Sequence, residues 1–243
     1  MLQIRSTENL AGISVRGNYD DLNELYNAFA SVVGGEDDYL YETASRLRVL
    51  GVCNEIRHAC IGNRELFERG YDIPCYGFRI LWPEAAFVAA VLDNFVFLST
   101  AKKLYVNRLP EEIKDQIQTV SADHISLIHF FQDLVWNELE RVIGGRQIKK
   151  VFGRYDDLRS MHFKYPQFDG FYTQWLDLLN IKYLCYDPKI RGAYLAPVLA
   201  KLFSADEEYL SLKSNIDSFA RQEGICVTGV RFAYGAYPDN IKW

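Results

Sequence analysis

The segment from Pro83 to about Ser99 constrains the fold most, because it has the length of a helix and is apolar nearly all round. Its bulky apolar side chains include Phe87, Val88, Val91, Leu92, Phe95, Val96 and Phe97. A helix without a polar face has to be enclosed by other elements, and Pro83 suits a first helical turn. We therefore predict a central core helix here rather than a ligand tunnel.

The chain is predicted to lie outside the membrane and in the cytoplasm. Its longest apolar stretch, Ala85 to Leu92, meets Asp93 and Asn94 before it could cross a bilayer of about 30 Å. Residues 1–5 lead straight into polar residues and lack the apolar core of a signal peptide. The five cysteines have apolar neighbours and no CxxC spacing, which is typical of reduced thiols.

The remaining periodicities predict a mainly helical α+β protein with a small, largely antiparallel sheet. Alternating residues predict strands at 2–5, 12–16, 76–81 and 225–232, and the first and last of these are candidates to pair. In the second strand, Ile13 and Val15 are expected to face inward. Helical spacing predicts helices at 22–33, 44–60 with Thr43 as its cap, 122–143, 168–179, 192–203, and 205–223 with Ser204 as its cap.

A repeated heptapeptide bears on domain organisation. Gly17 to Asn23 reads GNYDDLN and Gly153 to Arg159 reads GRYDDLR, and a weaker echo links Gly77–Ile80 with Gly229–Phe232. The echo fits either two distantly similar halves or coincidence. We expect one compact domain over 1–243, with sub-structure at 1–105 and 145–243 and a connection within 101–119.

The acidic pairs in the heptapeptides are Asp20, Asp21, Asp156 and Asp157. Aspartate favours helix caps and first turns because its carboxylate accepts from free backbone N–H groups. A divalent cation needs about six oxygen ligands, more than the local sequence supplies. We therefore expect capping at both copies rather than a metal site or acid and base catalysis.

No metal or cofactor is expected elsewhere. A five-residue spacing separates His124 and His129 by about 140° on a helix, so they cannot share one ion. His162 lies in an aromatic, loop-like run that suits packing or partner contact. The sequence contains no GxxxxGK[ST], GxGxxG, GxSxG or HExxH motif, which removes the simplest support for nucleotide, serine-hydrolase and zinc-protease functions.

The densest polar cluster straddles the end of the helix predicted at 44–60. It comprises Asn54, Glu55, Arg57, His58, Asn63, Arg64 and Glu65. Gly51, Asn54 and His58 share a helix face, and the bare Gly51 would let another group approach His58. That group could be a substrate or a neighbouring helix, and a histidine beside Arg and Glu is commonly a satisfied polar-face residue.

Arg79 and Arg231 each follow a glycine by two positions in a predicted strand. Each guanidinium would therefore project beside a bare patch of backbone that could admit a carboxylate or phosphate. The alternative is an internal ion pair with an aspartate, because a buried arginine needs a partner.

Several segments resemble a family of uncharacterised bacterial proteins. They are 7–12, 48–59 (RVLGVCNEIRHA), 80–84 (ILWPE), 179–184 (LNIKYL) and the pair Lys242, Trp243. The family is a domain of unknown function, so the resemblance implies bacterial origin and no activity that could be transferred to particular residues.

Two functions remain open, and a third is the least favoured. The formal net charge of −5, the pI near 5.5 and sixteen tyrosines favour an interaction or antidote-like regulatory protein with a basic protein partner. The alternative is an enzyme for a small anionic substrate, with His58 as acid or base, Glu55 orienting it, and Arg57 or Arg79 holding charge.

Nucleic-acid binding would need Lys149, Lys150, Arg154 and Arg159 to form a basic stripe on an acidic protein. The oligomeric state is not determined by the sequence.

Overall fold

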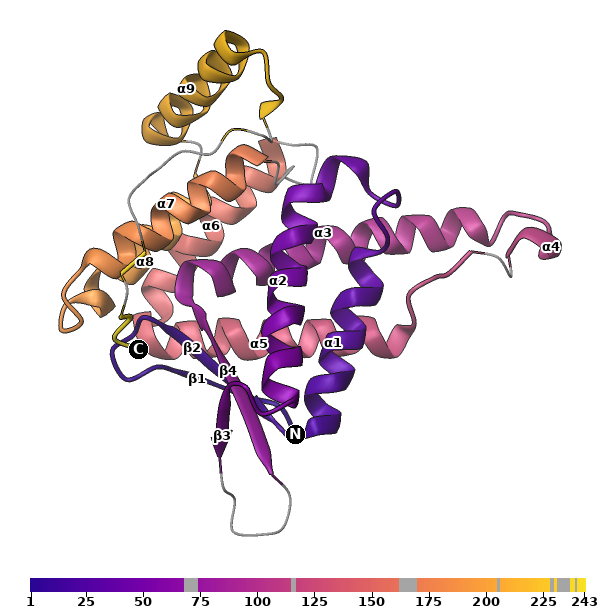
Figure 1. Cartoon of the computed structure of the whole chain (residues 1–243), viewed down its shortest axis with the longest axis horizontal. Coiled ribbons are helices and arrows are strands. Elements are labelled where there is room, and N and C mark those ends of the chain that lie inside the picture. The colour runs from indigo at the N-terminus through magenta and orange to yellow at the C-terminus, as the bar shows by residue number, and fades with distance from the viewer. Residues whose placement is uncertain are drawn as a thin grey trace.

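The protein is a mainly helical α+β structure with a four-stranded antiparallel sheet (Figure 1). The computed structural model describes residues 1–67, 74–114, 117–161, 170–204, 206–227, 230, 237–238 and 240–243, without the side chains of 158–161. In order, its elements are β1 (Gln3–Ser6), β2 (Gly12–Gly17), α1 (Tyr19–Val33), η1 (Leu40–Glu42), α2 (Thr43–Cys60), β3 (Glu65–Phe67), β4 (Cys75–Leu81), α3 (Trp82–Val106), α4 (Glu111–Lys114), α5 (Ala122–Ile143), α6 (Gly145–Met161), α7 (Gly170–Cys185), α8 (Arg191–Leu202) and α9 (Glu207–Glu223).

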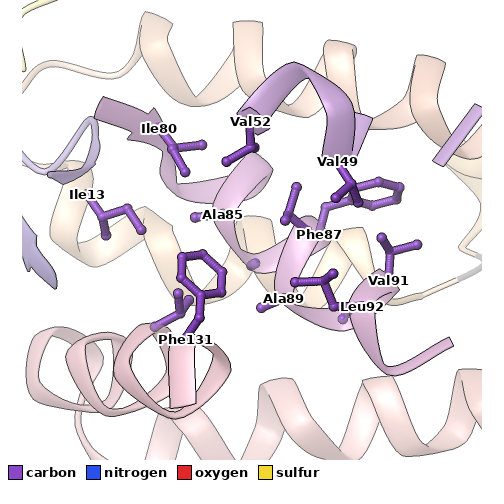
Figure 2. Close-up of a cluster of buried hydrophobic side chains, with 14 of the residues drawn as sticks. Ile13, Val49, Val52, Ile80, Ala85, Phe87, Ala89, Val91, Leu92 and Phe131 are labelled. Carbon is purple, nitrogen blue, oxygen red and sulfur yellow. The ribbon is translucent and has the colours of Figure 1, made fainter. Parts of the chain in front are cut away.

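Helix α3 is the centre of the core, as its apolar sequence predicts. Every residue from Trp82 to Leu92 is buried except Glu84, and α1, α2, α5, α7 and α8 all contact the helix. Figure 2 shows Phe87, Val91 and Leu92 of α3 in one cluster with Val49 of α2 and Phe131 of α5. The helix continues to Val106, beyond the predicted end near Ser99.

By length and composition α3 could also cross a membrane. The buried core helix of a folded domain meets the same criteria, and 61% of its most apolar window is buried against the rest of this chain. The charged residue Asp93 within this apolar helix is hydrogen-bonded inside the fold. Asp93 accepts hydrogen bonds from Gln132 Nε2 at 2.8 Å and from the Tyr155 hydroxyl at 3.1 Å, which satisfies a carboxylate on an otherwise apolar helix.

The sheet has the order β1-β2-β4-β3, and every neighbouring pair is antiparallel. Ile13 and Val15 of β2 are fully buried, which confirms their predicted inward orientation. Gly12 pairs with Leu81, and a Cβ at Gly12 would lie 1.9 Å from the Ile80 carbonyl oxygen, so only glycine permits this approach. Strand β3 was not predicted.

The two heptapeptides have different local structures. The first begins α1, where Asn18 and Asp21 form a reciprocal capping box. The second lies inside α6, a helix that the sequence did not predict, so the expected capping role of Asp156 and Asp157 is wrong. Helix α6 follows the Gly144 end of α5 at once and carries the chain through the second copy.

Several element boundaries differ from the prediction. The connection expected at 101–119 includes the end of α3 and the short helix α4. Thr43 is the first residue of α2 and does not cap it, and α9 is capped by Asp206 rather than Ser204. Residues 225–227 form no strand, most of 228–232 lies outside the described residues, and β1 pairs with β2.

Candidate functional site

In the polar cluster at the end of α2, Glu55 pairs with Arg64 and Asn54 with Arg57. Arg64 donates to Glu55 through Nε at 2.6 Å and Nη2 at 2.9 Å, which is a bidentate ion pair. Arg57 Nη2 donates to Asn54 Oδ1 at 2.7 Å. Both contacts are exposed, so Asn54, Arg57 and Arg64 form a solvated polar surface.

The structure does not bring the proposed catalytic residues into one site. His58 does not line the cavity beside α2, whereas Glu55 and Arg79 both do. The buried Nδ1 of His58 has no hydrogen-bond partner among the described residues. Gly51 lines this cavity and has nothing within 4 Å of the place where a Cβ would stand, but His58 is not among the lining residues.

This cavity is a cleft of about 830 Å³ between η1 and α2, the end of β4, the start of α3, and α7. Its volume falls within the range of ordinary ligand sites, about 300–1,000 Å³. Five charged side chains line it: Arg48, Glu55, Arg79, Glu84 and Asp177. We refer to it as the α2–α7 cleft.

An ionic cluster lies where α2, α3 and α7 meet in the cleft. Arg48 Nη2 bonds to Asp177 Oδ2 at 2.5 Å and to the Thr173 carbonyl oxygen at 3.1 Å, and Nη1 lies 3.6 Å from Glu84 Oε2. Burial opposes the charged guanidinium, but Glu84 and Asp177 outweigh it and raise the pKa of Arg48. Arg48 therefore stays charged and joins three helices.

Glu84 has a raised pKa, so it binds a proton more readily than an exposed glutamate does. Burial raises the pKa of Glu84 above its usual value, although Arg48 and a 2.9 Å hydrogen bond from Asn180 Nδ2 act in the opposite direction. Asp177 adds to the increase because it is a second negative charge nearby. A carboxyl group of this kind in a cleft can exchange a proton closer to neutral pH than an exposed glutamate can.

Tyr237 and Trp243 lie near side chains that line the cleft. The Tyr237 hydroxyl donates to Asp177 Oδ1 at 3.2 Å, and burial together with Asp177 raises the pKa of Tyr237 to about 12. The Arg79 guanidinium lies 5.7 Å from the centre of the Trp243 ring.

Arg79 adopts the internal pairing that was the alternative to an anion pocket. Its guanidinium forms an ion pair with Glu65 of the neighbouring strand β3, and not with an aspartate. Arg231, the second predicted anion-binding residue, lies outside the described residues.

The rim of the cleft is apolar and exposed. Leu40 is 68%, Tyr41 84% and Leu47 59% exposed, and all three line the cleft. They come from η1 and the first turns of α2. Apolar side chains gathered at the mouth of a polar cleft are typical of a binding surface.

Sequence reasoning did not identify Arg48, Glu84 or Asp177 as site residues. The available signal was a single charge on an otherwise apolar helix face, as in Trp175–Leu179 (WLDLL). Such a charge needs a partner, but the sequence does not say which one.

Other predicted features are placed as follows. His124 Nδ1 lies 2.8 Å from the Ser31 hydroxyl, His129 is exposed, and His162 is outside the described residues. Within the part of the chain that the structure describes, no three His, Cys, Asp or Glu side chains are grouped to hold a metal ion.

Comparison with other proteins gives a family and no activity. No curated protein and no solved structure matches the chain. A family model described as a domain of unknown function matches residues 2–243, which confirms the resemblance to a family without an assigned activity. The chain therefore belongs to the DUF6904 family.

Proposed function

We propose that this protein is a cytoplasmic interaction module of a regulatory, antidote-like kind that holds a basic, apolar-flanked segment of a partner protein in the α2–α7 cleft. The observation that carries the proposal is the exposed rim of Leu40, Tyr41 and Leu47 beside a lining with excess negative charge. Apolar anchors beside charges of complementary sign are the usual basis of a specific protein interface.

The charges of the cleft favour a cationic group over an anionic one. Glu55, Glu84 and Asp177 oppose Arg48 and Arg79, so carboxylates exceed guanidinium groups by one among the lining residues. Both guanidinium groups and all three carboxylates are paired: Arg48 with Asp177 and Glu84, Arg79 with Glu65, and Glu55 with Arg64. The preference for a cation therefore comes from the excess carboxylate and not from an unpaired charge. The net charge of −5 acts in the same direction by attracting a basic partner over a longer range.

The test is binding of labelled peptides that carry a Lys or Arg next to Leu or Tyr, compared with peptides in which Asp or Glu replaces the basic residue. Leu47→Ala should weaken binding of the basic peptides about tenfold, because burying a leucine side chain contributes roughly 1.5–3 kcal/mol. The matched control is Leu104→Ala, since Leu104 is 60% exposed and Leu47 is 59% exposed. Equal binding of acidic peptides, or equal loss in both variants, would contradict the proposal.

The alternative is an enzyme that acts on a small anionic substrate through His58, Glu55, Arg57 and Arg79. It has less support, because His58 and Arg57 do not line the cleft and Arg79 is paired. The raised pKa of Glu84 favours a different form of the enzyme hypothesis, with Glu84 as the proton-transferring group. Among the described side chains, a nucleic-acid interface has the exposed Lys149, Lys150 and Arg154 of α6 to support it, and the Arg159 side chain lies outside the described ones.

A further inference from the structure

Another, smaller cavity lies away from the α2–α7 cleft, where the end of α7, the start of α8, Pro238 and residues 240–242 meet. It has a volume of about 240 Å³, and its lining includes Cys185, Asp187, Arg191, Asn240 and Lys242. Since a water molecule takes up about 30 Å³ of liquid, the cavity could hold roughly eight waters, or a phosphate-sized group with a few waters.

Arg191 is the most unusual side chain in this lining. It is only 3% exposed, and its bonded nitrogens donate to main-chain carbonyl oxygens: Nη1 to Lys242 at 2.6 Å and Asn9 at 3.2 Å, and Nη2 to Leu184 at 3.2 Å. The buried Nε has no hydrogen-bond partner among the described residues. Within that part of the chain, no carboxylate forms an ion pair with Arg191.

A buried guanidinium with neutral acceptors and an unused N–H donor is energetically costly unless an anion is near it. Arg191 is also the first residue of α8, a twelve-residue helix without a side-chain cap, whose positive dipole end favours negative charge. Among the described lining residues, Arg191 and Lys242 outnumber the one carboxylate, that of Asp187, which accepts from the Lys189 N–H at 2.8 Å.

We propose that this cavity binds a tetrahedral oxyanion, either inorganic phosphate or the phosphate group of a monoester, between Arg191 and Lys242. Arg191 supplies a buried positive charge beside the cavity, and Lys242 supplies an exposed positive charge at its mouth. Arginine and lysine serve these two roles at many phosphate sites. This site is separate from the α2–α7 cleft and does not depend on the function proposed for that cleft.

Cys185 provides a local measurement because its exposed thiol lines the same cavity. Iodoacetamide is neutral, so its reaction with Cys185 can be followed by peptide mass spectrometry in phosphate, glycerol phosphate, sulfate or acetate at constant ionic strength. Phosphate and sulfate should slow alkylation of Cys185 in a saturable manner, whereas the exposed Cys226, which does not line the cavity, should react at an unchanged rate. Protection by glycerol phosphate as well would indicate a monoester ligand, and protection by the inorganic ions alone would indicate free phosphate.

Lys242→Ala keeps the main-chain carbonyl that Arg191 uses, so it tests the site without removing the support of the fold. It should raise the phosphate concentration for half-protection about two- to fivefold, the effect of losing one exposed charge. Lys189→Ala is the control, because Lys189 is also exposed but does not line the cavity. No saturable protection at tens of millimolar phosphate, equal protection by acetate, or equal effects of the two substitutions would overturn the proposal.

Discussion

Glu138 shows how a single charged side chain can fix the position of a strand. Glu138 Oε1 accepts from the N–H and the hydroxyl of Ser6, each at 2.6 Å, and Arg141 donates to both carboxylate oxygens at 2.8 and 2.7 Å. Burial alone would raise the pKa of Glu138, but these hydrogen bonds lower it to about 2. The bonds join β1 to α5, two elements far apart in sequence.

Because the pKa of Glu138 is lower in the folded state than in the unfolded state, its contribution to stability should be complete above about pH 4.5 and lost as the pH falls toward 2. Glu138→Gln should lower the free energy of unfolding at pH 7 by about 3 kcal/mol and flatten the acid side of the stability profile. Urea denaturation across pH is the measurement. Glu140→Gln, at an exposed position of the same helix, should change stability by less than about 0.5 kcal/mol.

At the scale of elements, identical residues have different roles in different contexts. The Tyr-Asp-Asp-Leu sequence starts α1 at its first copy and lies inside α6 at its second. The difference comes from the preceding residue at the helix start: Asn18 has an extended backbone and caps α1, whereas Arg154 is already helical. Tyr155 of the second copy instead bonds to Asp93 of the central helix.

The first copy should therefore be sensitive to loss of its cap, and the second should not. Asn18→Ala should destabilise the protein by about 1 kcal/mol, because the Asp21 N–H loses its acceptor. Asp157→Ala, at an exposed position within α6, should stay within about 0.5 kcal/mol of the wild type. Thermal and urea unfolding of both variants is the measurement, and equal losses would contradict the distinction.

At the scale of the whole molecule, residues 240–243 connect the two ends of the chain. Asn9 donates to the main-chain oxygen of Trp243 through its N–H at 3.0 Å and its Nδ2 at 2.8 Å, and Arg191 binds the carbonyls of Asn9 and Lys242. Figure 1 shows the C-terminus beside the β1–β2 turn. Tyr237 also hydrogen-bonds to Asp177 of the α2–α7 cleft, and the Trp243 ring lies 5.7 Å from the Arg79 guanidinium.

Removal of residues 240–243 should lower the free energy of unfolding by about 1.5–3 kcal/mol, because the charged Arg191 loses a short hydrogen bond while it remains buried. It should also speed proteolysis near the β1–β2 turn. Lys242→Ala retains the carbonyl and should be nearly neutral, within about 0.5 kcal/mol. A truncated protein as stable as the full chain would show that Arg191 does not need this segment.

The local patterns were sufficient to predict most of the individual elements. The helix at 122–143 has the predicted bounds, and the strands at 2–5, 12–16 and 76–81 lie within a residue or two of β1, β2 and β4. Helix α6 was missed although Ile148, Val151 and Tyr155 recur at helical spacing and are buried. Its glycines and charged residues lower its helix propensity, and packing against α5 and α8 decides its structure. Whether the chain divides into two related halves stays a prediction.

The sequence by itself determined the fold class and the central position of α3, because both follow from spacing along the chain. It also marked Glu55 and Arg79, which line the cleft. Only the tertiary structure decided that Arg48, Glu84 and Asp177 meet, that His58 stays apart, and that Arg191 is buried against residues at both ends of the chain. The physical reason is that burial and charge pairing depend on which elements pack together, and a local pattern shows that a charge needs a partner without identifying it.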